Sequence, residues 1–175
     1  MAGPVFLRGD TVTLRPEERE DVEFLQRNAN DPRIRHGMTF SEPQSYHAAE
    51  QRFEAHAESD DGDTGFLICV DEEPVGMVAL FDTDETGGCC EVAYWVTPAH
   101  QGNGYGREAV DLAVGYAFDE RRFHRVHARV LATNEASQAL LESVGFTREG
   151  TMREHLYVDG DYRDVHRYGL LAREH

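Results

Sequence analysis

The segment formed by residues 101–107 has a glycine at every second position: Gly102, Gly104 and Gly106. Because glycine has no side chain, backbone N–H groups in such a segment stay accessible, and a helix that begins there adds the positive end of its dipole. This arrangement predicts a loop that binds a phosphate or another anion. Its members are Gln101, Gly102, Asn103, Gly104, Tyr105, Gly106 and Arg107.

Two common phosphate loops do not fit this segment. A P-loop needs the pattern GxxxxGK[ST], and the chain has no lysine, since each of its 17 basic residues is an arginine. A dinucleotide-binding fingerprint needs GxGxxG, and Arg107 stands where the third glycine would be. The anion is therefore expected in another kind of loop between a strand and a helix.

The elements around the loop must place it at the end of a sheet. Residues 90–96 are predicted as a strand, and residues 104–120 as a helix whose apolar side chains repeat with helical spacing. Strands at 65–70 and 75–81 precede them with short polar connections, which indicates an antiparallel meander. A strand at 126–131 follows the helix, so a βαβ crossover is expected.

The rest of the chain adds helices and a hairpin to the same sheet. Gly145 is a C-terminal helix cap. The other predicted elements are strands at 11–14, 146–152 and 162–171 and helices at 17–28, 134–144 and 46–58, the last with its N-terminal signal at 41–43. We therefore predict an α/β (α+β) fold in which residues 1–175 form a single domain, with one mixed, mainly antiparallel central sheet flanked by helices.

Gln101, Gly104 and Gly106 form the pattern Q-x-x-G-x-G, and at this point the sequence resembles the GNAT superfamily of acetyltransferases. Further matches to that superfamily are residues 94–96, 134–137, 145–146 and 149–150. The runs 145–150 and 160–164 resemble the subgroup of ribosomal-protein alanine and serine N-acetyltransferases.

The resemblance implies a GNAT-like fold and acetyl-coenzyme A as the co-substrate. In that family the strand before the loop splays from its neighbour, and its free backbone groups bind the pantetheine arm and the thioester oxygen. Tyr94, Trp95 and Val96 should form that edge here, and the glycine loop should hold the pyrophosphate. Asn134 and Ser137 should contact the cofactor, although Asn or Ser at a helix start is also an ordinary N-cap.

Two residues are candidates for proton transfer. Glu91 lies on the same strand face as Trp95, so it is a candidate base for the amine; the alternative is an exposed charge at a strand end. In many relatives a tyrosine of the helix after the Asn motif assists the leaving thiol. Leu141 occupies that position here, so we assign Ser137 as proton donor or thiol-orienting group.

The activity implied by the resemblance is acetyl-CoA-dependent N-acetyl transfer to a primary amine. The resemblance to the ribosomal-protein subgroup makes a protein N-terminal α-amine the first expectation. Neutralising such an amine at pH 7 costs about 1.4 kcal/mol against about 4.6 kcal/mol for a lysine-type amine, so a water and a nearby carboxylate could serve as its base. A small amine (polyamine, antibiotic or amino acid) is the alternative acceptor, and a non-catalytic acyl-CoA-binding module is the alternative class. Residues 33–40 are expected to shape the acceptor side.

Composition argues against several other partners. With 33 acidic and 17 basic residues, the net charge of −16 excludes nucleic acid as a main ligand. No apolar run approaches the roughly 18 residues of a membrane span, and the first residues do not resemble a signal peptide, so a cytoplasmic location without a membrane partner is expected. No metal site is predicted, because His124 and His127 lie among arginines that would repel a cation. A homodimer is a candidate assembly.

The excess of carboxylates together with the absence of lysine resembles proteins of salt-loving organisms; the alternative is an ordinary acidic protein from a GC-rich genome. If the first interpretation holds, salt screens carboxylate repulsion and the thermal midpoint should rise with potassium chloride into the molar range. Thermal melts at low and at molar salt measure this. A midpoint that is flat or falls would reject the halophile hypothesis.

Overall fold

The computed structural model describes residues 3–38, 40–57 and 61–175. In this part of the chain, one eight-stranded sheet has the order β1-β2-β3-β4-β5-β6-β8-β7. Its strands are β1 Leu7–Arg8, β2 Thr13–Pro16, β3 Thr64–Val70, β4 Glu73–Asp84, β5 Cys89–Val96, β6 Arg125–Leu131, β7 Thr147–Val158 and β8 Asp161–Leu171. The helices are α1 Val22–Ala29, α2 Pro32–Met38, α3 Tyr46–Ala57, α4 Tyr105–Asp119 and α5 Glu135–Val144.

The predicted sheet is confirmed in its class and in its connections. Strands β3, β4 and β5 form an antiparallel meander, and helix α4 connects β5 to β6, which run parallel. Every other pairing in the described sheet is antiparallel. The fold is therefore the mixed, mainly antiparallel sheet flanked by helices that the sequence predicts.

Strands β5 and β6 separate after a short stretch of pairing. Their register joins Cys89 to Arg125, Cys90 to Val126 and Glu91 to His127. Both strands then continue, to Val96 and to Leu131, without pairing with each other. The splayed strand expected from the family resemblance is thus present, and the gap opens toward the glycine loop that follows β5.

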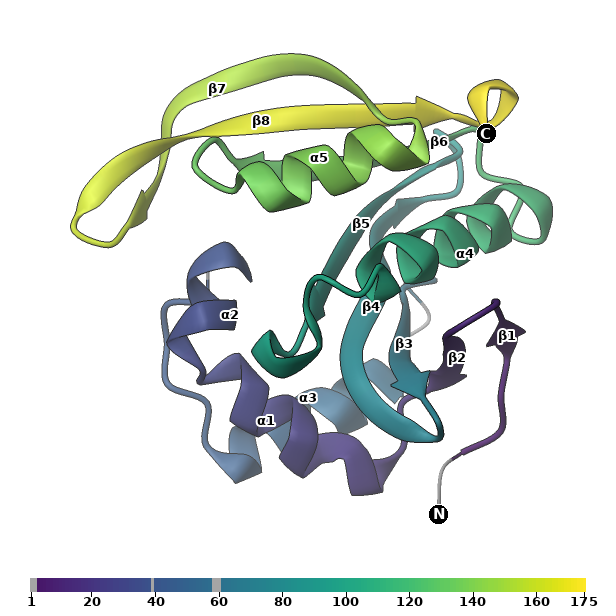
Figure 1. The fold of residues 1–175 in the computed structure, drawn as a ribbon, viewed down its shortest axis with the longest axis vertical. Helices are drawn as coiled ribbons and strands as arrows, with labels where there is room; N and C mark the ends of the chain where they lie inside the picture. Colours follow the sequence, from purple (N-terminus) through teal and green to yellow (C-terminus); the bar gives the residue numbers. More distant parts are fainter. Residues whose placement is uncertain (1–2, 39, 58–60) are drawn as a thin grey trace.

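The main core lies between the sheet and helix α4. The buried residues of this helix repeat with helical spacing and meet β-branched and aromatic side chains of the sheet. Burying such side chains contributes about 1.5–3 kcal/mol each. Figure 1 shows α1, α2 and α3 gathered at one end of the molecule, and the long β7–β8 hairpin lying over α5 at the other.

A buried ion pair fixes the turn between β2 and α1. Arg15 donates two hydrogen bonds of 2.8 Å to the carboxylate of Asp21, and the two residues are only 3% and 5% exposed. The backbone N–H of Glu18 also donates to Asp21, at 2.9 Å. Because each charge is compensated, the pair can be buried, whereas removal of either partner would leave an isolated charge in the interior. Glu17 lies in this turn, directly after β2, so the ion pair also fixes its backbone.

The structure differs from the predicted elements at several points. Helix α1 begins at Val22, not at residue 17, because a short 3₁₀ turn from Arg19 to Asp21 precedes it. Helix α2 was not predicted, since its seven residues are too few to show a helical period. Strand β7 runs to Val158, beyond the predicted end at residue 152, because its side chains are mostly exposed and carry no apolar alternation.

Two sequence predictions extend beyond the described residues. Residue 58, the predicted end of the helix that begins at residue 46, lies outside them, as does Thr39 within the predicted acceptor segment 33–40. Among the helices of the described part, none is long and apolar enough to cross a membrane.

Candidate active site

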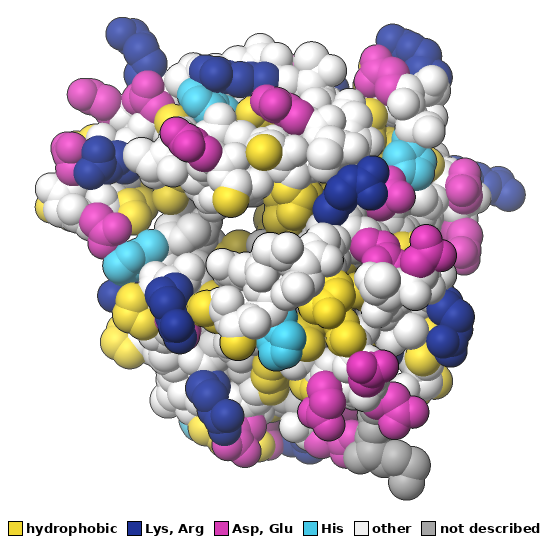
Figure 2. All heavy atoms as spheres, viewed as in Figure 1, with side chains coloured by type: hydrophobic (Ala, Val, Ile, Leu, Met, Phe, Trp, Pro, Cys, Tyr) yellow, Lys and Arg dark blue, Asp and Glu magenta, His cyan; other side chains and the backbone are white. Residues whose placement is uncertain are grey.

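One cavity of about 1040 Å³ extends from the glycine loop, through the gap between β5 and β6, to helices α1, α2 and α3. Figure 2 shows an opening near the centre of this face, between the part with α5 and the hairpin and the part with α1–α3. Of the predicted site residues, the cavity is lined by Glu91, Tyr94, Trp95, Val96, Gln101, Gly102, Gly104, Tyr105, Gly106, Arg107, Asn134 and Ser137. Asn103 does not line it.

The glycine loop forms an open cradle at the start of α4. Gly102 and Gly104 adopt left-handed backbone angles, with φ of 80° and 83°, and a Cβ on either would meet no atom within 4 Å. The space beside these two glycines is therefore open, which suits an anion site at a helix N-terminus. Gln101 and Asn103 hold the loop, donating hydrogen bonds to the carbonyl oxygens of Val96 (2.9 Å) and His100 (3.0 Å).

The third glycine of the loop has a different role. Gly106 is buried, and a Cβ there would lie 3.2 Å from Leu140 of α5 and 3.4 Å from Val96. It therefore permits a close approach between α4, α5 and the end of β5. Arg107, one residue further on, is exposed and donates a 3.4 Å hydrogen bond to the carbonyl of Ser143.

Asn134 is the N-cap of helix α5, which confirms the ordinary helix-capping role that the sequence analysis gave as the alternative. Its side-chain oxygen accepts a 3.1 Å hydrogen bond from the backbone N–H of Ser137. No hydrogen bond from its amide nitrogen is found within the described part of the chain, and this nitrogen faces Gly37 of α2 across the cavity. Asn134 thus caps the helix with one end and keeps donors available with the other.

The hydroxyl of Ser137 meets that of Tyr94, which reaches it from β5. The two oxygens are 2.7 Å apart, and either can donate. Tyr94 can also donate to the carbonyl of Ser137, at 3.3 Å. Burial raises the pKa of Tyr94 to about 12, so its proton stays in place at neutral pH. The sequence pointed to Tyr94 for its backbone alone and missed this hydroxyl contact.

Glu91 is not the exposed strand-end charge of the alternative interpretation. It is 5% exposed, and Arg129 of β6 donates a 2.8 Å hydrogen bond to its carboxylate. His127 lies 3.6 Å away. Burial alone would raise the pKa of Glu91, but its interactions with His127 and Arg129 outweigh burial and lower the pKa. The carboxylate is ionised at neutral pH and is a weak base.

Asp82, Glu91 and His127 also bring three metal-ligand atoms within 4.8 Å of one another. Arg129 occupies one oxygen of Glu91 and places a positive charge beside the group. A cation would have to share the carboxylate with a guanidinium, which is unfavourable at this distance. These residues therefore form an ion-pair cluster with Arg129 at the point where β5 and β6 separate.

The acceptor side of the cavity contains residues that sequence reasoning did not single out. Glu17, Asp63 and Phe53 line it, together with Trp95, whose ring centroid lies 5.7 Å from that of Phe24. Glu17, Asp63 and Phe53 come from separate segments, and no local spacing or motif marks them. The packing of α1 against α2 and α3, and of α2 against β5, brings them together.

Comparison with known proteins agrees with this geometry. Residues 11–147 match the acetyltransferase (GNAT) domain family, and the chain belongs to that family. It is 28% identical, over 166 residues, to the spermidine N(1)-acetyltransferase of Vibrio cholerae, with 94% of this chain and 95% of the relative covered. A crystal structure of the spermidine N-acetyltransferase from Vibrio cholerae in complex with CoA and spermine superimposes with a TM-score of 0.89, at 27% identity over 95% of this chain and 98% of the other.

A second kind of relative matches only part of the chain. The "Putative ribosomal N-acetyltransferase YdaF" of Bacillus subtilis is 36% identical over 99 residues, which is 57% of this chain and 54% of that protein. The protein is thus an acetyl-CoA-dependent N-acetyltransferase, and the ribosomal-protein resemblance is limited to about half of its length.

The open cradle makes a prediction about cofactor affinity. A valine at position 104 would put a branched side chain in the space in front of the loop and would strain the left-handed backbone, so coenzyme A should bind at least tenfold more weakly, a loss of about 1.4 kcal/mol. Isothermal calorimetry on Gly104→Val measures this. Gly104→Ala carries the same strain with less bulk and should lose less. Unchanged affinity in a folded Gly104→Val protein would refute the cradle.

Proposed function

We propose that the acceptor is a small polyamine-type cation and that the enzyme acetylates one of its terminal primary amines. The observation that carries this proposal is the acceptor half of the cavity. It is continuous with the glycine loop, it is covered by α1 and α3, and it is lined by the carboxylates of Glu17, Asp63 and Glu91 together with the guanidinium groups of Arg33, Arg52 and Arg129. Because Arg33 is paired with Asp31 and Arg129 with Glu91, the carboxylates of Glu17 and Asp63 can attract the ammonium groups of a flexible polycation.

The relatives support the same choice of acceptor. The similarity to the spermidine acetyltransferase covers nearly the whole of both chains, including the helices that form the acceptor side. The similarity to the ribosomal-type relative covers just over half of each chain. A small amine, which the sequence gives as the alternative acceptor, is therefore favoured over a protein N-terminus.

Cofactor recognition is assigned to the residues around the gap. The backbone N–H groups of the glycine loop and the dipole of α4 would hold the pyrophosphate. The free backbone edge of Tyr94, Trp95 and Val96 would bind the pantetheine arm, and an N–H aimed at the thioester oxygen contributes about 2.7–4 kcal/mol in comparable sites. The amide of Asn134 faces the same space and can donate to the arm. When bound, acetyl-CoA supplies the acetyl group and a thiol leaving group.

Three side chains are assigned to the charge of the amine and to the leaving thiol. Glu91, ionised and lining the cavity, attracts the ammonium group and can receive its proton through water. Tyr94 keeps its own proton, and when it donates to Ser137 the serine O–H is free to donate a hydrogen bond to the leaving thiolate. Ser137 is therefore the proton donor or thiol-orienting group, and Tyr94 positions it.

A panel of amines tests the acceptor. We expect spermidine to be acetylated with at least tenfold higher kcat/KM than peptides that start with Ala or Ser, measured by release of free thiol. Neutralising an amine of lysine type costs about 4.6 kcal/mol at pH 7, so kcat/KM for spermidine should rise with pH through this range. A preference for the peptides would reject the polyamine proposal. No thiol release with any amine would indicate a binding module instead of an enzyme.

Ser137→Ala tests the role of the serine. Turnover should fall, by about 10²-fold or less, because a thiol with a pKa near 8.5 is already a fair leaving group. If Ser137 delivers a proton, the loss should shrink as pH rises past the thiol pKa, and Tyr94 with its pKa of about 12 stays protonated throughout. Steady-state rates from pH 6 to 10 measure this. A pH-independent loss would indicate positioning, and unchanged turnover would refute the role.

A further inference from the structure

Glu17 lies at the far end of the acceptor half of the cavity. It follows β2, and its carboxylate rests on the sheet over Gly65 of β3, where a Cβ on the glycine would overlap it. The methyl group of Met77 borders the same spot. The absence of a side chain at position 65 therefore leaves the room that the carboxylate occupies.

The Glu17 carboxylate has no hydrogen-bond donor among the residues that the structure describes. Burial raises its pKa, the charge of His56 on α3 lowers it, and the charge of Asp21 raises it again. A carboxylate that is partly withdrawn from water and has no donor is unfavourable. An ammonium group that arrives through the cavity would supply both the donors and the opposite charge.

A row of small residues connects the reaction centre to Glu17. Ala93 of β5 pairs with Ala79 of β4, which pairs with Gly65 of β3, so the three share one face of the sheet. The neighbouring rows on that face are large: Trp95 with Met77 on one side, and Glu91 with Phe81 on the other. All seven residues line the cavity. The row of small residues thus leaves a channel across the sheet, bordered on each side by the larger side chains.

The length of this channel favours amines with two ammonium groups far enough apart to span it. Adjacent strands lie about 4.8 Å apart, so the two steps from β5 to β3 span roughly 10 Å. An extended triamine of the spermidine type can place one terminal amine at the β5 edge and reach Glu17 with the other. Diaminobutane is too short to do both, and a monoamine has no second charge.

We propose that Glu17 is a specificity-determining residue that binds the distal ammonium group of a triamine while the other terminal amine is acetylated at the edge of β5. The inference rests on the proposed polyamine acceptor and names the residue that distinguishes a long polycation from a simple amine. It requires no role for Glu17 in the chemistry itself, so the effect belongs in KM for the long substrate.

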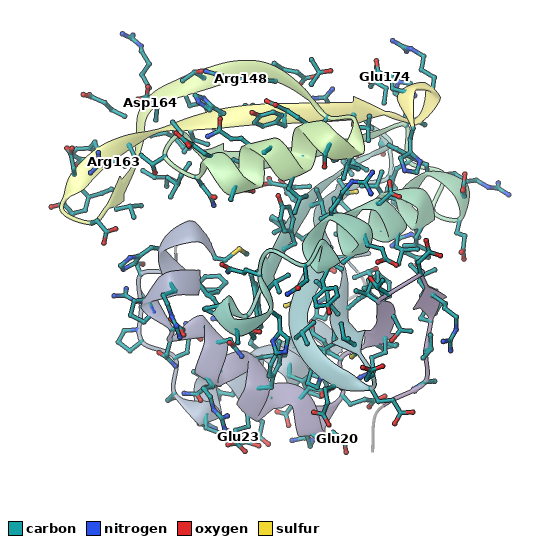
Figure 3. The ribbon with its side chains drawn as sticks, viewed as in Figure 1. Glu20, Glu23, Arg148, Arg163, Asp164 and Glu174 are labelled. Atoms are coloured by element: carbon teal, nitrogen blue, oxygen red, sulfur yellow. The ribbon has the colours of Figure 1, made fainter. Side chains whose placement is uncertain are left out.

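The test compares spermidine with butylamine on the wild type and on Glu17→Gln. The variant should lower kcat/KM for spermidine at least tenfold, mainly through KM, and should change kcat/KM for butylamine less than twofold. Glu23→Gln is the matched control: Glu23 lies on the exposed side of α1, pairs with Arg27 and points away from the cavity in Figure 3. It removes the same charge and should leave both substrates within twofold of the wild type.

Two further variants separate the binding role from a loss of folding. Gly65→Ala places a methyl group where the carboxylate lies and should weaken spermidine selectively without any change in charge. Glu17→Asp keeps the charge but shortens its reach, so KM for spermidine should lie between those of the wild type and Glu17→Gln. Thermal melts confirm that each variant is folded.

The possible results separate this inference from the proposed function. If Glu17→Gln loses activity equally on both amines, or loses none on spermidine although the wild type prefers spermidine to butylamine, the role of Glu17 is overturned and the polyamine acceptor stands. If the wild type itself does not prefer spermidine to butylamine, the proposed acceptor fails, and the inference fails with it.

Discussion

The site depends on the point at which strands β5 and β6 stop pairing. Their parallel ladder ends at Glu91 and His127, and both strands continue without each other. Backbone N–H and C=O groups that are released in this way need other partners. The edge of β5 is therefore suited to bind an amide-containing chain such as pantetheine, and the glycine loop, helix α5 and the acceptor side all meet at this gap.

Glu91 connects the architecture of the gap with its chemistry. Its ion pair with Arg129 joins β5 to β6 where their backbone pairing ends. The pair is partly buried, so the loss of either partner would leave an uncompensated charge. The same pairing keeps the carboxylate ionised and facing the cavity. A substitution at Glu91 would consequently alter both the shape of the gap and its charge, and would not isolate a proton-transfer step.

The sequence predicts those parts of the site whose signals are local. The alternate glycines, the N-cap at Asn134 and the meander of β3, β4 and β5 each depend on neighbours in the chain, and all three are present. The acceptor side could not be predicted, because Glu17, Phe53 and Gly65 come from separate segments that only the folded chain brings together. The contact of Tyr94 with Ser137 was missed for the same reason, since 43 positions separate them.

The gap has a further consequence for the durability of the folded chain. Within the described sheet, the two parts β1–β5 and β6–β8 are joined by a short backbone ladder of three residue pairs between β5 and β6. A molecule that lies in the gap contacts both parts and so links them by non-covalent contacts. Any ligand restricted to the native state adds RT ln(1 + [L]/Kd), about 2.7 kcal/mol at a hundredfold excess over Kd. The co-substrate pool would then influence not only how fast this enzyme works but also how long each copy survives.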